Sequence, residues 1–585
     1  MKKLMGFIFL LLLSWLLLAV IGGCATTDAG SSKKLTSLEL AELMGNGINL
    51  SNTMEAYGHL KPGINQTPQV YETLWSQPVT TKEMLLAMKN AGFDSIRIPV
   101  AWTNTMDFEN GDYTISAAYL ARVEEIVNYA LAADMYAVIN DHWDGSWWGM
   151  FGSAAQETRD KGMQLYIAMW KQIARQFRNY SNKVIFESAN EELGSRLNDV
   201  NVAEDSGTLS EDECYQTTNR INQTFVDTVR SSGGNNRERF LLIAGYNTNI
   251  DKTCDERFIM PTDTIAGKLL ISVHYYDPWT YCGTDSISRW GNTKEHEEMN
   301  SALAKMKKYT DKGYGVIIGE YGPNPVLSDG TRKANIINYI QNFLDNCDLY
   351  GYVPMLWDIG GYFNRTRLCI EDEATAALYK KRSYSALSSL TWEEIKARAK
   401  QSIQAALVKS RDYKEAAPAL DGDGKAVAWI MYNSNDWAIT YSVGDQYNPG
   451  SKTDGVVATD VRITKAGIYT VSLDFTGTAK GYANSIAFSA LGISNGEVLF
   501  PGYIITIKEV LVNGKPYALT GIPYTTTDNK ICTRVNLYNA WVNKVPLEAR
   551  TANGDVSNVS PVVIDNKTLG QVKSIAITFE YAPAN

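Results

Sequence analysis

The sequence predicts a (β/α)8 barrel followed by an all-β sandwich. Apolar strand-like runs alternate with helical stretches from about Leu38 to Lys409, the order expected of a barrel of strand–helix units. After about Ala426 the pattern changes to short alternating strands separated by Gly, Asn and Asp turns, which is typical of a sandwich. A doubly wound open sheet is the alternative for the first region. The absence of a Gly-rich phosphate turn after an early strand counts against its nucleotide-binding form.

Eight apolar runs are expected to form the strands of the barrel, with helical patterns such as 116–133 and 162–180 between them. Catalytic residues of such barrels lie at the carboxyl ends of the strands, so polar residues that follow these runs are the candidates. The runs are Gly47–Asn52, Ser95–Val100, Tyr136–Asn140, Val184–Ala189, Phe240–Gly245, Leu269–His274, Val316–Glu320 and Val353–Trp357.

Two of these runs bring a glutamate to the end of a strand. Glu191 follows the fourth run, and Glu320 ends the seventh. Hydrolysis of a glycosidic bond needs two carboxyl groups, one to donate a proton and one to act as nucleophile or base. The pair therefore predicts a glycoside hydrolase, a chemistry that requires no cofactor and no metal.

Six further signals follow one another along the chain: GINLSNT at 47–53, RIPV at 97–100, NDHWD at 140–144, Asn190-Glu191, HYY at 274–276 and Trp357. In this order they resemble the motifs of glycoside hydrolase family 5 over roughly residues 38–409. Three positions depart from the family pattern: Glu192 replaces a proline after Glu191, Trp143 replaces a second histidine, and Ser51 replaces a common glycine. None removes a group that the chemistry requires.

This resemblance implies a role for each candidate residue. Glu191 would be the general acid and then the base, which calls for a raised pKa, and Glu320 would be the ionised nucleophile. Arg97 and Tyr276 would lie near Glu320, and His274 near Glu191. The remaining expected substrate contacts are Asn190 on the sugar 2-hydroxyl, His142 in the subsite of the reacting sugar, Trp357 as its platform, and Trp143 and Asn52.

A tryptophan-rich loop, residues 143–149, is predicted to form a cleft wall for further sugar units. It carries Trp143, Trp147 and Trp148 among Gly, Ser and Asp residues, which argue against a buried helix. Trp102 and Trp279 are candidates at neighbouring strand ends. At least one of these five tryptophans is expected to belong to the core, because tryptophan is usually buried.

The first 23 residues are predicted to be a lipoprotein signal peptide. Lys2 and Lys3 precede an apolar stretch, and the small residues before Cys24 resemble a bacterial lipobox whose cysteine is lipidated. An ordinary signal peptide with a chance cysteine is the alternative. Residues 24–37 would be a tether, and Ala25 favours an outer-membrane or cell-surface destination. In this oxidising location the six remaining cysteines could form disulfides, whose pairing the sequence leaves open.

The C-terminal region is predicted to be a separate module. A helix begins at a capping box at Thr391 and closes the 38–410 catalytic domain, residues 411–425 form a linker, and 426–585 form the sandwich. The sandwich loosely resembles a carbohydrate-binding module. A structural domain with buried aromatic side chains is the alternative. The candidate sugar contacts are Trp429, Trp437, Tyr441 and Trp541.

The expected function is a retaining endo-β-1,4-glucanase or xyloglucanase that acts on plant cell-wall β-glucan. The net charge of −9 argues against nucleic acid as a partner. We expect a monomer that meets the membrane only through its lipid. A β-mannanase of the same fold, a catalytically silent glycan-capture lipoprotein and a structural surface protein are the alternatives. The last two need neither Glu191 nor Glu320.

Overall fold

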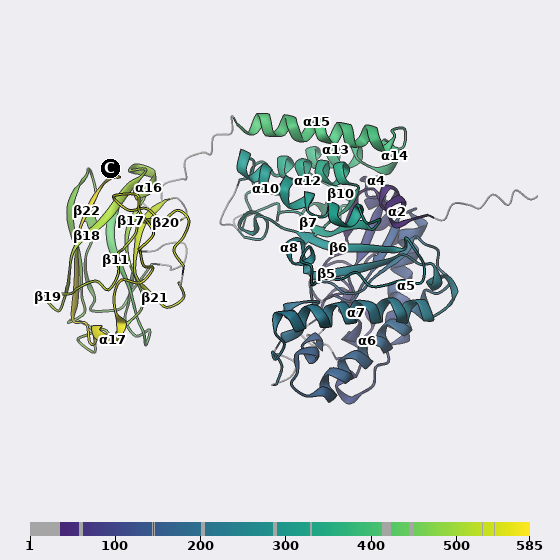
Figure 1. The fold of residues 1–585 in the computed structure, drawn as a ribbon, viewed down its shortest axis with the longest axis horizontal. Coiled ribbons are helices and arrows are strands. Elements are labelled where there is room, and N and C mark those ends of the chain that lie inside the picture. The colour runs from purple at the N-terminus through teal and green to yellow at the C-terminus, as the bar shows by residue number, and fades with distance from the viewer. Residues whose placement is uncertain are drawn as a thin grey trace, which may run out of the picture. The chain divides into compact units, whose positions relative to one another are not determined.

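The computed structural model describes residues 35–57, 63–142, 144, 147–199, 205–284, 289–327, 330–411, 423–443, 450–528, 531–542 and 544–584. The predicted signal peptide, Cys24, Trp143 and most of the predicted linker lie outside these ranges. The chain forms two compact units, one on each side of residues 412–422, and each has its own hydrophobic core (Figure 1). Within the described ranges, no helix has the length and apolarity needed to cross a membrane.

The first unit is a closed barrel of eight parallel strands, so the predicted barrel is confirmed and the open sheet is excluded. Each strand pairs with the next along the chain, and β1 pairs with β8 to close the circle. The strands are β1 (Gly47–Asn49), β2 (Ser95–Ile98), β3 (Tyr136–Ile139), β4 (Val184–Glu187), β5 (Leu241–Asn249), β6 (Leu269–Tyr275), β7 (Gly315–Tyr321) and β8 (Tyr352–Leu356).

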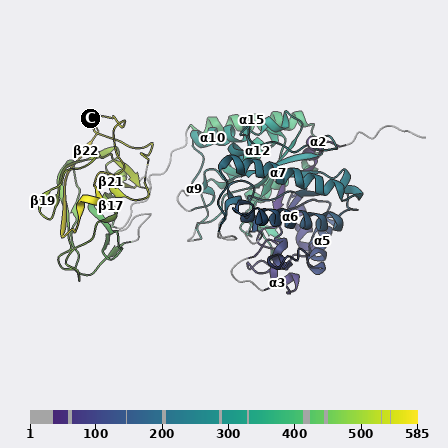
Figure 2. The same ribbon diagram turned by 60° about the horizontal axis from the view of Figure 1, so that its bottom comes forward.

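Helices surround this barrel (Figure 2). Helix α2 (Ser37–Met44) covers the amino-terminal end of the barrel, where Leu40 and Met44 pack against strand residues such as Ile317. The others are α3 (Pro68–Glu72), α4 (Lys82–Asn90), α5 (Ala117–Ala132), α6 (Gln156–Gln176), α7 (Glu211–Ser231), α8 (Ile250–Thr253), α9 (Trp279–Cys282), α10 (Thr293–Ala304), α11 (Lys307–Thr310), α12 (Ile336–Tyr350), α13 (Glu373–Lys381), α14 (Tyr384–Leu387) and α15 (Trp392–Ser410).

Irregular pairing at the carboxyl ends of three strands shapes the open face of the barrel. Three neighbouring strand pairs each contain one shift of register. In the β5–β6 pair it lies between Ala244 and Asn249 of β5, in the β6–β7 pair between Val273 and His274 of β6, and in the β7–β8 pair between Ile318 and Tyr321 of β7. Such irregularities re-aim side chains and are frequent beside active sites. After the shift, His274 pairs with Glu320, so two candidate residues stand side by side on adjacent strands.

Trp147 and Trp148 of the predicted cleft wall are core residues, which corrects the sequence-based expectation for these two. Trp147 and Trp148 are buried, stack on each other with ring centroids 4.3 Å apart, and pack against Tyr166 of α6. Trp102 is also buried and donates its Nε1–H to the Asn140 carbonyl at 2.7 Å. Trp279 is exposed, so it alone of these four can reach a ligand freely.

The second unit consists of two antiparallel sheets that share a core. Ile430, Leu491 and Val535 of one sheet belong to the same apolar cluster as Val471 and Ile577 of the other. The first sheet contains β11 (Val427–Ser434), β12 (Thr440–Ser442), β13 (Ser451–Lys452), β15 (Val461–Arg462), β17 (Ile486–Ser494), β20 (Thr526–Asp528) and β21 (Cys532–Asn539). The second contains β14 (Val457–Thr459), β16 (Gly467–Asp474), β18 (Tyr503–Val512), β19 (Lys515–Pro516) and β22 (Ser574–Pro583).

Two of the four aromatic residues proposed as sugar contacts on this unit are buried, so that expectation is wrong for them. Trp429 packs in a small cluster with Met431 and donates to Ser494 Oγ at 2.9 Å, and Tyr441 donates to Asp460. Their polar atoms find partners inside the unit. The six cysteines after Cys24 all lie in described residues, and each is a free thiol.

Candidate active site

A cleft of about 720 Å³ opens at the carboxyl ends of the barrel strands. Its lining combines four carboxyl groups, those of Glu55, Glu191, Glu320 and Asp358, with a set of aromatic rings, a composition suited to a polar ligand that has flat apolar faces. The side chains that matter most are Glu55, Tyr57, Trp75, His142, Glu191, Tyr276, Trp279, Glu320 and Trp357.

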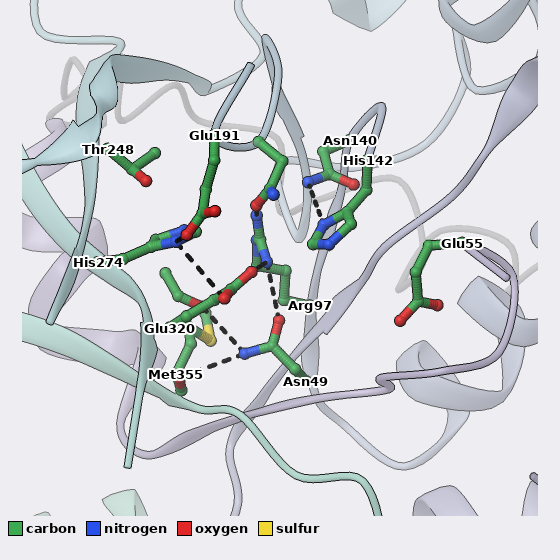
Figure 3. Close-up of polar contacts among 12 residues, drawn as sticks. Asn49, Glu55, Arg97, Asn140, His142, Glu191, Thr248, His274, Glu320 and Met355 are labelled. Atoms are coloured by element: carbon green, nitrogen blue, oxygen red, sulfur yellow. Dashed lines mark hydrogen bonds and ion pairs between the residues drawn. The ribbon is translucent and has the colours of Figure 1, made fainter. Parts of the chain in front are cut away.

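Glu191 and Glu320 face each other at this cleft, with His274 between them (Figure 3). One oxygen of each carboxyl group and a ring nitrogen of His274 all lie within 4.8 Å of one another. His274 Nδ1 is 3.0 Å from Glu191 Oε1 and 3.5 Å from Glu320 Oε2. The Glu191 side chain is 28% exposed and that of Glu320 only 7%, so Glu191 is the more accessible of the two.

A fully buried arginine, Arg97, bonds to Glu320 and to Asn190, the residue before Glu191. Arg97 Nη1 donates to Glu320 Oε1 at 2.9 Å and to Asn49 Oδ1 at 3.0 Å, and Nη2 donates to Asn190 Oδ1 at 2.8 Å. Its Nε donates to Glu187 Oε2 at 2.7 Å. Burial lowers the pKa of Arg97, but the charges of Glu187 and Glu320 raise it by more, so the guanidinium stays charged.

Sequence reasoning missed Glu187 and Asn49, which complete the arginine's surroundings. Glu187 is buried, and its other oxygen accepts a hydrogen bond from Ser272 at 2.6 Å. Asn49 donates to the Gly319 carbonyl at 2.9 Å. A signal was present, because a charged residue inside the apolar run VIFE must find a buried partner, and Arg97 interrupts another such run.

The two carboxyl groups differ in their pKa values in the protein alone. Burial raises the pKa of Glu191, but its hydrogen bond with His274 and the charges of His274 and Arg196 outweigh this, so the net shift is downward. At Glu320 burial raises the pKa by more than His274 and Arg97 lower it. The raised pKa expected for Glu191 is therefore wrong for the unliganded protein, because the hydrogen bond and charge of His274, which was expected nearby, together with the charge of Arg196, lower the pKa by more than burial raises it.

Glu320 accepts a further hydrogen bond, from the Tyr276 hydroxyl at 3.0 Å. With Arg97 on its other oxygen, the carboxyl group is held in one orientation. Arg97 and Tyr276 thus lie beside Glu320, as expected. His274 lies beside Glu191, also as expected.

His142 and Trp357 form a flat wall of the cleft. Their rings are stacked with centroids 5.5 Å apart and an interplanar angle of 9°. Burial lowers the pKa of His142 well below its usual range, so this imidazole is neutral and behaves as an aromatic surface. Both rings line the cleft beside the carboxyl pair, where a sugar ring can stack.

Asn190 and Asn52 occupy different places in this arrangement. Asn190 is buried, its oxygen is bound by Arg97, and its buried Nδ2 has no hydrogen-bond partner among the described residues. Asn52 adopts a left-handed φ of 60°, and its backbone N–H donates to Glu55. Asn52 thus shapes the cleft through a neighbour that lines it.

Glu55 is a third carboxyl group of the cleft, which the sequence analysis did not single out. It is 1% exposed and also accepts the Thr53 N–H at 2.8 Å. Burial raises the pKa of Glu55 to about 7. Tyr57 and Trp75, with ring centroids 6.2 Å apart, lie on the same cleft lining and were also missed.

Comparison with known proteins agrees with this geometry. A family model described as cellulase, glycosyl hydrolase family 5, matches residues 60–362. Endoglucanase A of Paenibacillus barcinonensis is 34% identical over 371 residues, which cover 58% of this chain and 87% of that protein.

Two solved structures are similar to the barrel unit. A Bacteroides ovatus family 5 xyloglucanase in complex with a XXXG heptasaccharide has a TM-score of 0.52 and 30% identity, covering 60% of this chain and 77% of its own. A broad-specificity endoglucanase from Ruminococcus champanellensis with bound cellotriose has a TM-score of 0.52 and 29% identity, covering 59% and 99%. The family match spans more than half of the chain and includes both strand-end glutamates, and the chain belongs to glycosyl hydrolase family 5.

Proposed function

We propose that the barrel unit is a retaining, endo-acting glycoside hydrolase that cleaves β-1,4-glucan backbones such as cellulose, mixed-linkage glucan or xyloglucan. The observation that carries this is the spacing of the two carboxyl groups, because one oxygen of Glu191 and one of Glu320 lie within 4.8 Å of each other. Retaining enzymes hold their carboxyl groups about 5–5.5 Å apart, and inverting enzymes hold them roughly 6.5–9.5 Å apart to admit a water molecule. The names of the relatives, an endoglucanase and a xyloglucanase, support the substrate class.

The reaction proceeds in two displacements at the anomeric carbon. In the first, the Glu320 carboxylate attacks this carbon while Glu191 gives its proton to the departing glycosidic oxygen, leaving a sugar ester on Glu320. In the second, the Glu191 carboxylate takes a proton from water, and the resulting hydroxide oxygen displaces Glu320. Both glutamates return to their starting states, and two inversions leave the β configuration unchanged.

The surroundings of the two glutamates favour this assignment over its reverse. Glu320 is almost buried and held by Arg97 and Tyr276, as a nucleophile that must attack along one line requires. Glu191 is more exposed and is therefore better able to meet a leaving group. A sugar oxygen that accepts a hydrogen bond from protonated Glu191 stabilises that protonated form and counteracts the lowered pKa.

The substrate contacts follow from the cleft lining. The His142–Trp357 wall supports the reacting sugar by stacking, and the Asn190 Nδ2 donates to its 2-hydroxyl. Trp279, which is 59% exposed, and Trp75 extend the cleft for further sugar units.

We also propose that the protein is an exported, lipid-anchored monomer of the outer membrane or cell surface, with a tether and, at 411–425, a linker to a glycan-binding sandwich. The predicted tether, 24–37, is shortened at its end, because Thr36 caps α2 and Ser37 begins it. The lipobox-like sequence before Cys24 supports the anchor. Replacement of Cys24 by Ala is expected to move the protein from the membrane fraction to the soluble fraction and to abolish labelling by radioactive palmitate. Labelling that survives the substitution rejects the anchor.

The stereochemistry of the product tests the proposed mechanism. We expect the first sugar product, followed by proton NMR from the start of hydrolysis, to be the β anomer, because two displacements occur at the same carbon. An α anomer formed first contradicts the assignment of Glu320 as a nucleophile. A parallel panel of cellulose, xyloglucan, lichenan and mannan, scored for new reducing ends, tells a β-glucanase from a β-mannanase.

Substitution of Glu320 by Gln is expected to lower kcat on a soluble β-glucan by several powers of ten, because an amide cannot form the ester intermediate. The matched control is Glu192→Gln. Glu192 accepts the Asn190 N–H at 2.8 Å, and Gln keeps an oxygen for that bond, so substantial activity should remain. If Glu320→Gln keeps more than about a tenth of wild-type activity, Glu320 is not the nucleophile. If Glu192→Gln is inactive, the general acid is Glu192 and not Glu191.

Replacement of His274 by Ala should move the pH profile of kcat/KM upward as a whole. His274 lowers the pKa of both carboxyl groups, so its removal raises both values. Since both pKa values that bound the active range rise, the acid limb and the alkaline limb of the profile both move to higher pH. His296→Ala is the control, because His296 is buried against Trp290, outside the cleft lining. A profile that stays in place or moves downward contradicts the role of His274.

A further inference from the structure

Two tryptophans lie side by side on the surface of the sandwich unit. Trp437 is 54% exposed and Trp541 is 67% exposed, and their ring centroids are 6.1 Å apart with an interplanar angle of 35°. Neither belongs to the cores of this unit. Leaving two large apolar rings in water is unfavourable, and adjacent exposed aromatic side chains are typical of a binding site.

The turn that carries Trp437 is held by several side-chain hydrogen bonds. It connects β11 to β12, and Asp436 Oδ1 accepts hydrogen bonds from Ser434 Oγ at 2.6 Å and the Ala438 N–H at 3.2 Å. Asp436 Oδ2 is bound by Asn484 at 2.6 Å and Lys480 at 2.9 Å. Trp437 itself has a left-handed φ of 55°, an unfavourable conformation for a bulky residue that is maintained only where the surroundings impose it.

Trp541 is brought to the same place by the sheet. It follows β21, which borders one side of β17 while β11 borders the other. Its backbone N–H donates to Asn539 Oδ1 at 3.0 Å, which closes a tight turn. The two tryptophans therefore come from strands that flank β17, more than 100 positions apart in sequence, and the sheet sets their separation.

Polar side chains lie in or beside the turns that carry the two rings. Asn435 and Asp436 belong to the Trp437 turn, Asn484 bonds Asp436, and Asn539 precedes Trp541. Amide and carboxylate groups beside aromatic faces match a pyranose ring, which presents C–H groups on its faces and hydroxyls around its edge.

We propose that Trp437 and Trp541 form a binding site for a single β-glucan chain, with sugar rings stacked on the two indoles and hydroxyls bonded by the surrounding amides. The choice of β-glucan rests on the function proposed for the barrel. The 35° angle between the rings selects the physical form of the ligand. Two tilted rings cannot both lie flat on one crystal face, but they can meet successive sugars of a chain that twists. The ligand is therefore a soluble or amorphous chain, and crystalline cellulose is not bound through this site.

The test uses the full chain carrying Glu320→Gln, so that the polysaccharide is not degraded, and compares it with the same chain carrying Trp437→Ala and Trp541→Ala. Affinity electrophoresis in gels containing xyloglucan or hydroxyethylcellulose measures the dissociation constant. We expect the double substitution to weaken binding about tenfold, since tryptophans that become buried in a complex contribute most of its binding energy. The matched control is Ile468→Ala, at a residue that is 65% exposed on β16 of the other sheet, and it should change nothing.

Three further measurements complete the test. Microcrystalline cellulose should retain the parent and the double variant equally. A chain that keeps Glu320 and carries only Trp437→Ala and Trp541→Ala should hydrolyse short soluble oligosaccharides at the wild-type rate. Equal gel retardation of parent and double variant overturns the proposal. So does a parent dimer that the double variant abolishes, seen by sedimentation velocity, because the surface would then bind a second copy.

Failure of this site is distinguishable from failure of the proposed function. If the wild-type chain releases no reducing ends from any β-glucan, the assignment of the barrel is wrong whatever the gels show. If hydrolysis is normal and the tryptophan pair makes no difference to retention, the barrel assignment stands and the binding site is rejected.

Discussion

The site depends on one buried cation. The guanidinium of Arg97, on β2, binds Asn49 on β1, Glu187 on β4, Asn190 beyond the end of β4, and Glu320 on β7. It thus connects four parts of the barrel that are far apart in sequence. A buried charge is tolerated only when its partners are complete, and loss of one partner of a buried pair typically costs about 3–5 kcal/mol. The same bonds that satisfy the arginine therefore fix the position of Glu320 and of the Asn190 amide.

The arginine also explains why the barrel tolerates charged residues in its interior. Glu187 is neutralised by Arg97 and bound by Ser272 and Asn140, so no lone charge remains in the apolar strand. Glu320 lies at the upper edge of this network, where one face meets the cleft. The hydrogen bonds that stabilise the barrel interior and those that position Glu320 thus form one continuous network. Of Arg97, Glu187 and Glu320, Glu320 is the one that lines the cleft and can contact a ligand.

His274 connects the two glutamates electrostatically. Its backbone pairs with that of Glu320 in the β6–β7 register. Its Nδ1 atom lies close to a carboxyl oxygen of Glu191 and to one of Glu320. Because an oxygen of Glu191 and an oxygen of Glu320 lie within 4.8 Å of each other, the charge of Glu191 raises the pKa of Glu320, and a substrate that changes the protonation of Glu191 also acts on Glu320. The irregular register at the end of β6 is what brings the imidazole to this place.

The sequence by itself determined the barrel, the sandwich, and the strand ends that carry Glu191 and Glu320, because apolar periodicity and chain order are local properties. The tertiary structure decided which tryptophans are buried. Trp147 and Trp148 pack against α6 while Trp437 and Trp541 stay exposed, although the residue type is the same in all four. It also decided the pKa direction of Glu191, since His274 lies 83 positions away in sequence yet 3.0 Å away in space. Burial and electrostatics arise from contacts between distant segments, and those contacts exist only once the barrel has closed.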